Sequence, residues 1–361
     1  MTTLLDELKA LIAQRGPITV EQYMQTALAH PDFGYYMNRD PFGATGDFTT
    51  APEISQMFGE LIGLWAAEVW TGMGSPGLVR LVELGPGRGT LMSDALRAMR
   101  IAPAFREAVD VWLVETSPSL ATMQHELLLD CGVSVSWAQS LQDVPDGPAI
   151  LIGNEFLDAL PVRQFVRVAG QWRERVVRLD EGGNLAFDVA RSSERLIDAK
   201  GRDGDVLEVN PSGHRFMFEL GTRLVKQNGA ALLIDYGHAA TGFGDTLQAL
   251  RAHRYIDPLE APGESDLTAH VDFAAMARSA SAAGASVSGP IDQGDFLRAI
   301  GIDQRTRALA ERAGPERAQE LQQARSRLVG KAKGEMGALF KTLAVANRRL
   351  PPPPGFRPAT R

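Results

Sequence analysis

Residues 79–90 read V-R-L-V-E-L-G-P-G-R-G-T, and this stretch is more informative than any other in the chain. A hydrophobic run that carries Glu83 leads into the alternating glycines Gly85, Gly87 and Gly89, and a helical pattern follows. Glycine lets a backbone turn tightly and lets a ligand approach it closely. The stretch therefore predicts a strand, a sharp turn and the N-terminus of a helix, which together form a ligand-binding turn of an α/β protein.

The spacing of the glycines indicates which ligand this turn accepts. Thr90 stands where a dinucleotide fingerprint would have its third glycine, so the pattern favours S-adenosylmethionine over NAD(P). That ligand has no pyrophosphate; it presents a methionine ammonium and carboxylate, a sulfonium, a ribose diol and an adenine. We predict that Glu83, the glycine turn with Pro86, and Thr90 bind it.

A second predicted strand, residues 109–115, ends in Glu115, which follows Gly89 by 26 positions. In a doubly wound sheet, an acid at this strand end can accept hydrogen bonds from both ribose hydroxyls. The alternative is an acid that only terminates a surface strand. Pro118 suits the first turn of the helix that follows.

Composition narrows the class of protein. The chain has 361 residues, of which 44% are hydrophobic, so about two domains are expected. Its net charge of −7 does not favour a nucleic-acid partner. Cys131 is the single cysteine, which excludes an internal disulfide, and the six histidines show no metal-ligand spacing, so no metal is expected. No apolar run reaches the roughly 18 residues of a membrane helix.

The first residues, M-T-T-L-L-D-E-L-K-A-L-I, carry Asp6 and Glu7 within a short amphipathic pattern. This resembles neither a secretory signal nor an acid-poor transit peptide. We therefore expect a cytoplasmic protein of bacterial type. Exposed apolar positions in the terminal helices could support a homodimer.

The pattern of elements predicts an α/β protein with a Rossmann-like, doubly wound sheet and added segments. Thr19 is the expected N-cap of a helix, with Gln22 at capping-box spacing. Short alternating runs between glycine-rich turns predict an inserted antiparallel hairpin subdomain. The expected regions are 1–76, helical with a lid loop; 77–160, first half of the core; 161–210, hairpins; 211–302, second half of the core; and 303–361, helices to 347 and an extended Pro-rich tail. A last pair of strands is expected to flank residues 285–302.

Polar residues at the carboxyl ends of the predicted strands define a candidate site, because ligands of open α/β sheets bind there. Besides Glu83 and Glu115, the predicted cofactor-binding residues at these ends are Thr116, Ser117, Gln139, Ser140, Asn154 and Phe156.

The run Asn154 to Pro161, N-E-F-L-D-A-L-P, carries two candidate catalytic carboxylates, Glu155 and Asp158. A carboxylate can pair bidentately with a guanidinium and hold one nitrogen in line with a sulfonium. The alternative is a capped helix N-terminus in which the acids only complement the dipole. Asp47, in the Gly-Asp-Phe sequence at 46–48, is a third candidate carboxylate on a lid loop, with an ordinary turn as its alternative.

These motifs together resemble the MidA family of class I methyltransferases, whose mitochondrial members are respiratory complex I assembly factors. The resemblance covers about residues 20–300, and its segments are 30–36, 46–52, 83–90, 114–118, 154–161, 234–237, 244–247 and 266–273. It implies an S-adenosylmethionine-dependent protein arginine N-methyltransferase whose partner is a protein substrate, the 49 kDa-type subunit of complex I. By position, the glycine turn and Glu115 would bind the cofactor, and the loops at 46–48 and 154–155 would border the methyl-transfer centre.

Three other functions remain open from the sequence. The first is a small-molecule N- or O-methyltransferase, because a fold does not determine its substrate. The second is a non-catalytic assembly chaperone that binds a protein partner. The third is a nucleotide-dependent oxidoreductase, which the missing third glycine disfavours.

Overall fold

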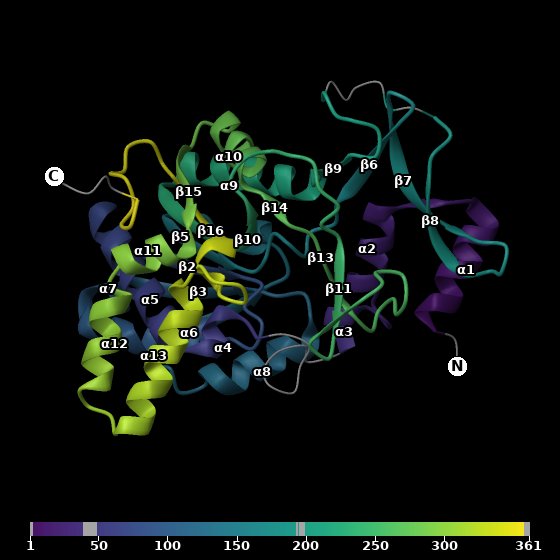
Figure 1. Ribbon diagram of the computed structural model, residues 1–361. Helices are drawn as coiled ribbons and strands as arrows, with labels where there is room; N and C mark the ends of the chain where they lie inside the picture. Colours follow the sequence, from purple (N-terminus) through teal and green to yellow (C-terminus); the bar gives the residue numbers. More distant parts are fainter. Residues whose placement is uncertain (1–2, 39–48, 193, 195–198, 357–361) are drawn as a thin grey trace. The chain divides into compact units, whose positions relative to one another are not determined.

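The structure is a computed structural model that describes residues 3–38, 49–192, 194 and 199–356 (Figure 1). Backbone contacts divide the chain into two compact units, each assembled from segments distant in sequence. Unit 1 comprises Met1–Phe48, Asp158–His214 and Thr241–His270, and unit 2 comprises Thr49–Leu157, Arg215–Ala240 and Val271–Arg361.

Unit 2 is built on an eight-stranded sheet of order β15-β16-β10-β5-β2-β3-β4, with β14 paired to β10. Its strands are β2 (Val79–Leu84), β3 (Val109–Val114), β4 (Val135–Ala138), β5 (Ala149–Asn154), β10 (Gly229–His238), β14 (Val271–Asp272), β15 (Ser286–Asp292) and β16 (Phe340–Ala346). If β14 is left out and the other seven strands are numbered 1 to 7 along the chain, their order across the sheet, starting from β4, is 3-2-1-4-5-7-6. Strand β16, the seventh, is antiparallel to both of its neighbours.

The central strands form because they are apolar along their whole length. Every residue of β5 is buried, as are the first seven residues of β10. Strands of a parallel sheet are covered on both faces, so they read as continuous hydrophobic runs. The order of the strands reverses between β2 and β5, and this reversal marks the crevice where an open α/β sheet binds its ligand.

Helices complete unit 2. They are α4 (Ala51–Ile54), α5 (Gln56–Gly72), α6 (Thr90–Ala98), α7 (Pro103–Ala108), α8 (Pro118–Leu128), α10 (Phe273–Ala282), α11 (Gln293–Ala299), α12 (Ile302–Ala310), α13 (Pro315–Val329) and α14 (Met336–Leu339), with 3-10 turns at Met99–Ile101 and Leu141–Asp143. Helix α9 (Pro211–Gln227) starts in unit 1 and continues in unit 2. Helices α5 and α6 approach closely at Gly63, where a Cβ would lie 2.7 Å from the Cα of Ala95.

Unit 1 contains two antiparallel sheets and three helices among its described residues. The helices are α1 (Leu4–Arg15), α2 (Val20–Ala29) and α3 (Tyr35–Asn38); the strands are β1 (Ile18–Thr19), β6 (Arg163–Val168), β7 (Gln171–Leu179), β8 (Leu185–Val189), β9 (Val206–Val209), β11 (Gln248–Arg251), β12 (Arg254–Ile256) and β13 (Asp266–Thr268). The predicted hairpins are confirmed as β6-β7-β8. The predicted capping box is also confirmed, since Gln22 N donates to Thr19 Oγ1 at 3.1 Å and Thr19 N donates to Gln22 Oε1 at 2.9 Å.

The division into units differs from the predicted regions. The region 1–76 is shared between both units, because α5 packs against α6 within unit 2. Residues 241–270 lie with unit 1, where β11, β12 and β13 form a three-stranded sheet. Chain order alone does not reveal such discontinuous assembly, because the contacts that decide it join segments distant in sequence.

Two local predictions for the C-terminal part are wrong. Phe340–Ala346 is not helical but forms β16, which pairs with β10 and β15. The last pair of strands, expected to flank residues 285–302, is not found as such: this range holds the single strand β15, followed by helix α11. The Pro-rich tail is partly docked: Pro353 and Pro354 are buried, and the indole of Trp65 donates to the Pro354 carbonyl at 3.2 Å. Short apolar runs suit a strand or a helix equally, and tertiary contacts decide between them.

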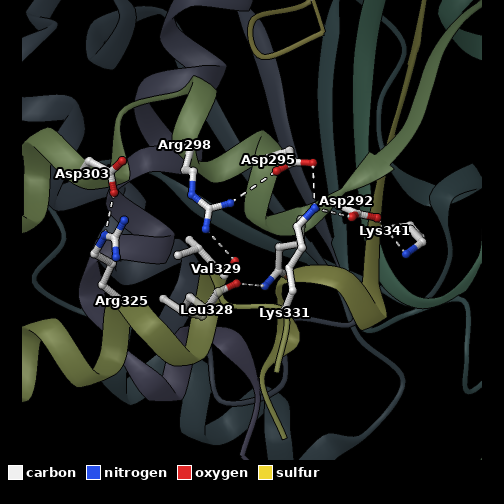
Figure 2. Close-up of polar contacts among 10 residues, drawn as sticks. Asp292, Asp295, Arg298, Asp303, Arg325, Leu328, Val329, Lys331 and Lys341 are labelled. Atoms are coloured by element: carbon white, nitrogen blue, oxygen red, sulfur yellow. Dashed lines mark hydrogen bonds and ion pairs between the residues drawn. The ribbon is translucent and has the colours of Figure 1, made fainter. Parts of the chain in front are cut away.

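Side chains from α11 bind the end of α13 in unit 2 (Figure 2). Gln293 donates to the Leu328 carbonyl at 2.9 Å and Arg298 donates to the Val329 carbonyl at 3.0 Å. These bonds satisfy carbonyls that the helix leaves without intrahelical partners. Just beyond α13, the Lys331 ammonium forms an ion pair with the Asp292 carboxylate of β15 at 2.9 Å.

The docked end of the chain should stabilise unit 2. The ring of Phe356 lies 5.4 Å from that of Phe296, which is fully buried. We expect Phe356→Ala to lower the free energy of unfolding by about 2 kcal/mol, because it removes a partly buried aromatic ring. Urea denaturation measures this. The control is Ile101→Ala at a side chain that is 76% exposed, and an equal loss in both variants would contradict the docking.

Candidate active site

The predicted glycine turn lies between β2 and α6, as expected. All three glycines have left-handed backbone angles, with φ of 59° at Gly85, 55° at Gly87 and 85° at Gly89. L-residues with a Cβ avoid this region, so the alternating glycines are a requirement of the turn. At Gly85, a Cβ would lie 3.3 Å from the ring of Phe156, which brings the loop after β5 against the turn.

Glu83 is buried in the last part of β2, with 3% of its surface exposed. Burial raises the pKa of its carboxyl to about 8; the backbone N–H of Met92 opposes this rise and the charge of Glu115 adds to it. Its Oε2 is buried without a hydrogen-bond partner in the described part of the chain. Such an orphaned acceptor is rare in folded proteins and calls for an explanation.

A second orphaned acceptor lies at the end of the neighbouring strand. Asn154 closes β5, and its buried Oδ1 has no hydrogen-bond partner among the described residues. Strands β2 and β5 are paired in parallel, with Glu83 opposite Ile152. Two unsatisfied oxygens at adjacent strand ends suit a donor-rich cation, and the ammonium of S-adenosylmethionine fits that requirement.

Glu115, just beyond β3, is held by neighbouring donors. Its Oε1 accepts the Ser117 N–H at 2.8 Å and its Oε2 accepts the Gln124 Nε2 at 3.1 Å. Burial raises the pKa of this carboxyl, and these hydrogen bonds oppose the rise. The carboxylate is therefore oriented before any ligand arrives.

The other predicted residues near Glu115 differ in what they do. The Ser117 hydroxyl caps α8 by accepting the Leu120 N–H at 3.4 Å, whereas Thr116 is exposed. Gln139 is exposed after β4, and Ser140 donates to Asp143 at 2.6 Å. The Glu115 N–H donates to the Ala138 carbonyl at 2.9 Å, so the ends of β3 and β4 are joined beside these residues.

Glu155 begins the loop after β5 in a conformation that few non-glycine residues adopt, with φ of 52°. Its Oε1 accepts the Ala51 N–H and the Asn154 Nδ2, each at 3.2 Å. The side chain thus fastens the start of α4 to the end of β5. Backbone strain of this kind persists where the surrounding structure enforces it, often at functional sites.

Asp235 holds the rest of this loop. Its Oδ2 accepts the backbone N–H groups of Phe156 at 3.1 Å and Leu157 at 2.8 Å, while Oδ1 accepts that of Tyr236 at 2.9 Å. Asp235 is 1% exposed and lies within β10. Two of its three partners are 78 and 79 positions away, so only the fold reveals what it binds.

Sequence reasoning missed two further residues. Glu53 accepts the Thr90 hydroxyl at 2.6 Å, which ties α4 to the first residue of α6. Gln124 is fully buried beneath the glycine turn and donates to the Gly87 carbonyl at 2.7 Å. A signal for Gln124 exists in the sequence: it lies between Leu120 and Leu128 on the apolar face of α8, where a polar residue is unexpected.

Two of the three candidate carboxylates lie among the described residues, one in each unit. Glu155 belongs to unit 2, whereas Asp158 belongs to unit 1, where it is 5% exposed. In unit 1, burial raises the pKa of Tyr36 well above its usual value, with Asp266 and Asp158 adding to the rise. Asp47, with its neighbours Gly46 and Phe48, lies outside the described residues.

Other kinds of site are absent from the described residues. No cluster of three or more His, Cys, Asp or Glu side chains could hold a metal ion there. None of the described helices combines the length and the apolar character needed to cross a membrane.

The sheet order with its antiparallel seventh strand, the glycine turn and the acids at the ends of the first two core strands define a class I methyltransferase fold. The family described as "Putative S-adenosyl-L-methionine-dependent methyltransferase" matches residues 61–291. The chain belongs to this family, and S-adenosylmethionine is its cofactor.

Known proteins similar to this chain agree with that assignment. Protein arginine methyltransferase NDUFAF7 of Danio rerio is 37% identical over 96% of this chain and 87% of its own length, and the Homo sapiens protein is 38% identical over 96% and 83%. A Burkholderia thailandensis protein, crystallised with bound S-adenosyl-homocysteine, is 28% identical with a TM-score of 0.83, covering 99% of this chain and 93% of its own.

The comparisons also correct one prediction. We expected a cytoplasmic protein, but the curated relatives from fish, frog, fly and mammals are named as mitochondrial. The expectation is wrong because it rested on a short N-terminal pattern. The pattern of the first dozen residues carries little information on the cellular compartment of a protein.

Proposed function

We propose that this protein is an arginine N-methyltransferase that acts on a protein substrate. The observation that carries the proposal is the similarity, at 36–38% identity over 89–98% of this chain, to proteins named as protein arginine methyltransferases. The resemblance to complex I assembly factors makes the 49 kDa-type subunit of complex I the first candidate substrate. A homodimer is the accompanying proposal for its oligomeric state.

The proposed cofactor site lies at the carboxyl ends of β2, β3, β4 and β5. Glu83 and Asn154 offer their orphaned oxygens to the ammonium, and Glu115 accepts from the ribose hydroxyls. The turn at 85–90 lines the site, with Pro86, Thr90 and Phe156 around it. Thr116, Ser117, Gln139 and Ser140 border the adenine. When bound, S-adenosylmethionine supplies a methyl group already activated by its sulfonium.

The protein mainly contributes position and exclusion of water. Phe156 lies against Gly85 and edge-on to the ring of Phe216, at 5.1 Å between centroids, so an apolar wall backs the loop after β5. We propose that Glu155 orients the guanidinium of the substrate and takes its proton as the new bond forms. Asp47 and Asp158 are the other candidates for this role.

The decisive experiment combines binding with product analysis. Calorimetric titration of the purified protein with S-adenosyl-homocysteine, and with NADH as a control, tests the cofactor class. Incubation with methyl-labelled S-adenosylmethionine and cell proteins, followed by mass spectrometry, identifies the methylated residue. Methylarginine supports the proposal, whereas a labelled small molecule or a methyl group on another residue type contradicts it.

Binding of the cofactor's ammonium should release a proton from Glu83. The pKa of this carboxyl in the free protein is about 8, so at pH 7 it is mostly protonated, and an adjacent cation favours the ionised form. We expect release of nearly one proton per S-adenosyl-homocysteine at pH 7 and affinity that rises up to about tenfold per pH unit below 8. Titrations in buffers of different ionisation enthalpy measure the proton.

The matched variant for this prediction is Glu83→Gln, which keeps the shape of the side chain and cannot ionise. It should bind without that proton release, and identical proton counts in both proteins would refute the role of Glu83. A rise in pH should strengthen cofactor binding through Glu83, but it should weaken the contribution of Glu83 to the stability of the folded protein. Because the pKa of Glu83 is higher in the folded state, its contribution to stability is complete below about pH 4.5 and is lost as pH rises through 8.

A further inference from the structure

One buried amide joins the two halves of the proposed cofactor site. Gln124 Nε2 donates to the Gly87 carbonyl at 2.7 Å and to Glu115 Oε2 at 3.1 Å, so both of its hydrogens are used. Gln124 Oε1 accepts the indole N–H of Trp137 at 2.9 Å. The side chain is fully buried, and its Cγ lies 3.4 Å from where a Cβ of Gly89 would be.

This arrangement needs an amide rather than another polar group. The turn and Glu115 both present acceptors, so the group between them must donate twice. The Trp137 indole presents a donor, so the third atom must accept. A glutamine meets all three demands in one orientation, because the reverse orientation would set Oε1 against the oxygens of Gly87 and Glu115.

We propose that Gln124 is a positioning residue for cofactor binding. It sets the distance between the turn that faces the methionine part and the carboxylate that faces the ribose, and it keeps that carboxylate oriented. This inference rests on the proposed cofactor site, because Gln124 acts through Gly87 and Glu115. Gln124 is thereby the side chain through which helix α8 supports the site.

The test compares two buried glutamines of unit 2. Gln124→Met removes both donors to the site; Gln293→Met makes the same chemical change at another fully buried residue, whose amide donates to the Leu328 carbonyl. Both should lower the melting temperature. We expect Gln124→Met to raise the Kd for S-adenosyl-homocysteine about 30-fold, as loss of a supporting outer partner does at other sites, and Gln293→Met to leave it within about twofold.

A second variant keeps the inference testable if Gln124→Met does not fold. Gln124→Glu preserves size but faces Glu115 with a second acid, which repels it once ionised. We expect the ratio of its Kd to the wild-type Kd to rise at least about tenfold from pH 6 to pH 8.5. Both proteins contain the same other charged and titratable groups, namely Glu83 at the end of β2, Arg88 in the turn and His125 on α8. Their contributions to the pH dependence of the Kd therefore cancel in the ratio.

The outcomes separate this inference from the proposed function. If the wild-type protein does not bind S-adenosyl-homocysteine, the proposed cofactor site is wrong and Gln124 has no role in it. If the wild type binds while Gln124→Met binds as tightly as Gln293→Met, the positioning role alone is overturned. A pH-independent ratio for Gln124→Glu would overturn it as well.

Discussion

Replacing Gly87 with valine is expected to weaken binding of S-adenosyl-homocysteine by at least about 100-fold. Gly87 has φ of 55°, a left-handed conformation that costs an L-residue about 1–2 kcal/mol and a β-branched residue more. Valine must either hold this strain or shift the turn, and the shift would move the Gly87 carbonyl away from Gln124, which binds it at 2.7 Å. Each 1.4 kcal/mol corresponds to about tenfold in affinity.

Calorimetric titration measures the effect, and Gly74→Val provides the matched control. Gly74 has φ of 88°, and no atom lies within 4 Å of the point where a Cβ would stand, so valine there meets comparable backbone strain in open space of the same unit. We expect Gly74→Val to lose stability and keep its affinity. Tight binding by a folded Gly87→Val protein would show that the cofactor does not approach this turn.

Replacing Glu155 should separate catalysis from structure. If Glu155 takes a proton from the substrate, Glu155→Gln lowers the rate of methyl transfer by about 10²–10⁴-fold, which is the usual contribution of a general base. Glutamine retains an oxygen that can accept the Ala51 N–H, now 3.2 Å from Oε1, so the link from β5 to α4 is preserved. The Kd for S-adenosyl-homocysteine should change less than about threefold.

The alternative is that Glu155 serves only to fasten that link. In this case Glu155→Gln would remain active, and Glu155→Ala, which removes the acceptor, would lose both activity and stability. Transfer of labelled methyl groups to protein measures activity, and thermal denaturation measures stability. Equal loss of turnover and cofactor affinity in Glu155→Gln would exclude the role as base.

Much of the core could be predicted because its determinants are local. The first strand, the glycine turn and the second strand are each set by a short pattern, and the structure confirms them as β2, the turn at 85–89 and β3, which ends one residue before the predicted end at Glu115. The three left-handed angles at Gly85, Gly87 and Gly89 follow from the same residues. The roles assigned to Glu83, Glu115 and Asn154 remain predictions, although the orphaned oxygens of two of them give those roles a physical basis.

Other features depended on partners far away in the sequence. Phe340–Ala346 becomes a strand because it fits between β10 and β15, although its own pattern suits a helix as well. Pro354 is buried because Trp65 donates to its carbonyl, across 289 positions. Asp158 and Glu155 lie in different units despite being three residues apart.

Short sequence patterns were enough to predict the class of protein, the glycine turn and the acids at the strand ends. Which groups hold them in place depends on the tertiary structure: Asp235 binds the loop after β5, and Gln124 binds the glycine turn. The physical reason is the range of the interactions. A backbone angle and an apolar run are properties of adjacent residues, whereas a buried hydrogen bond exists only once folding brings its donor to its acceptor.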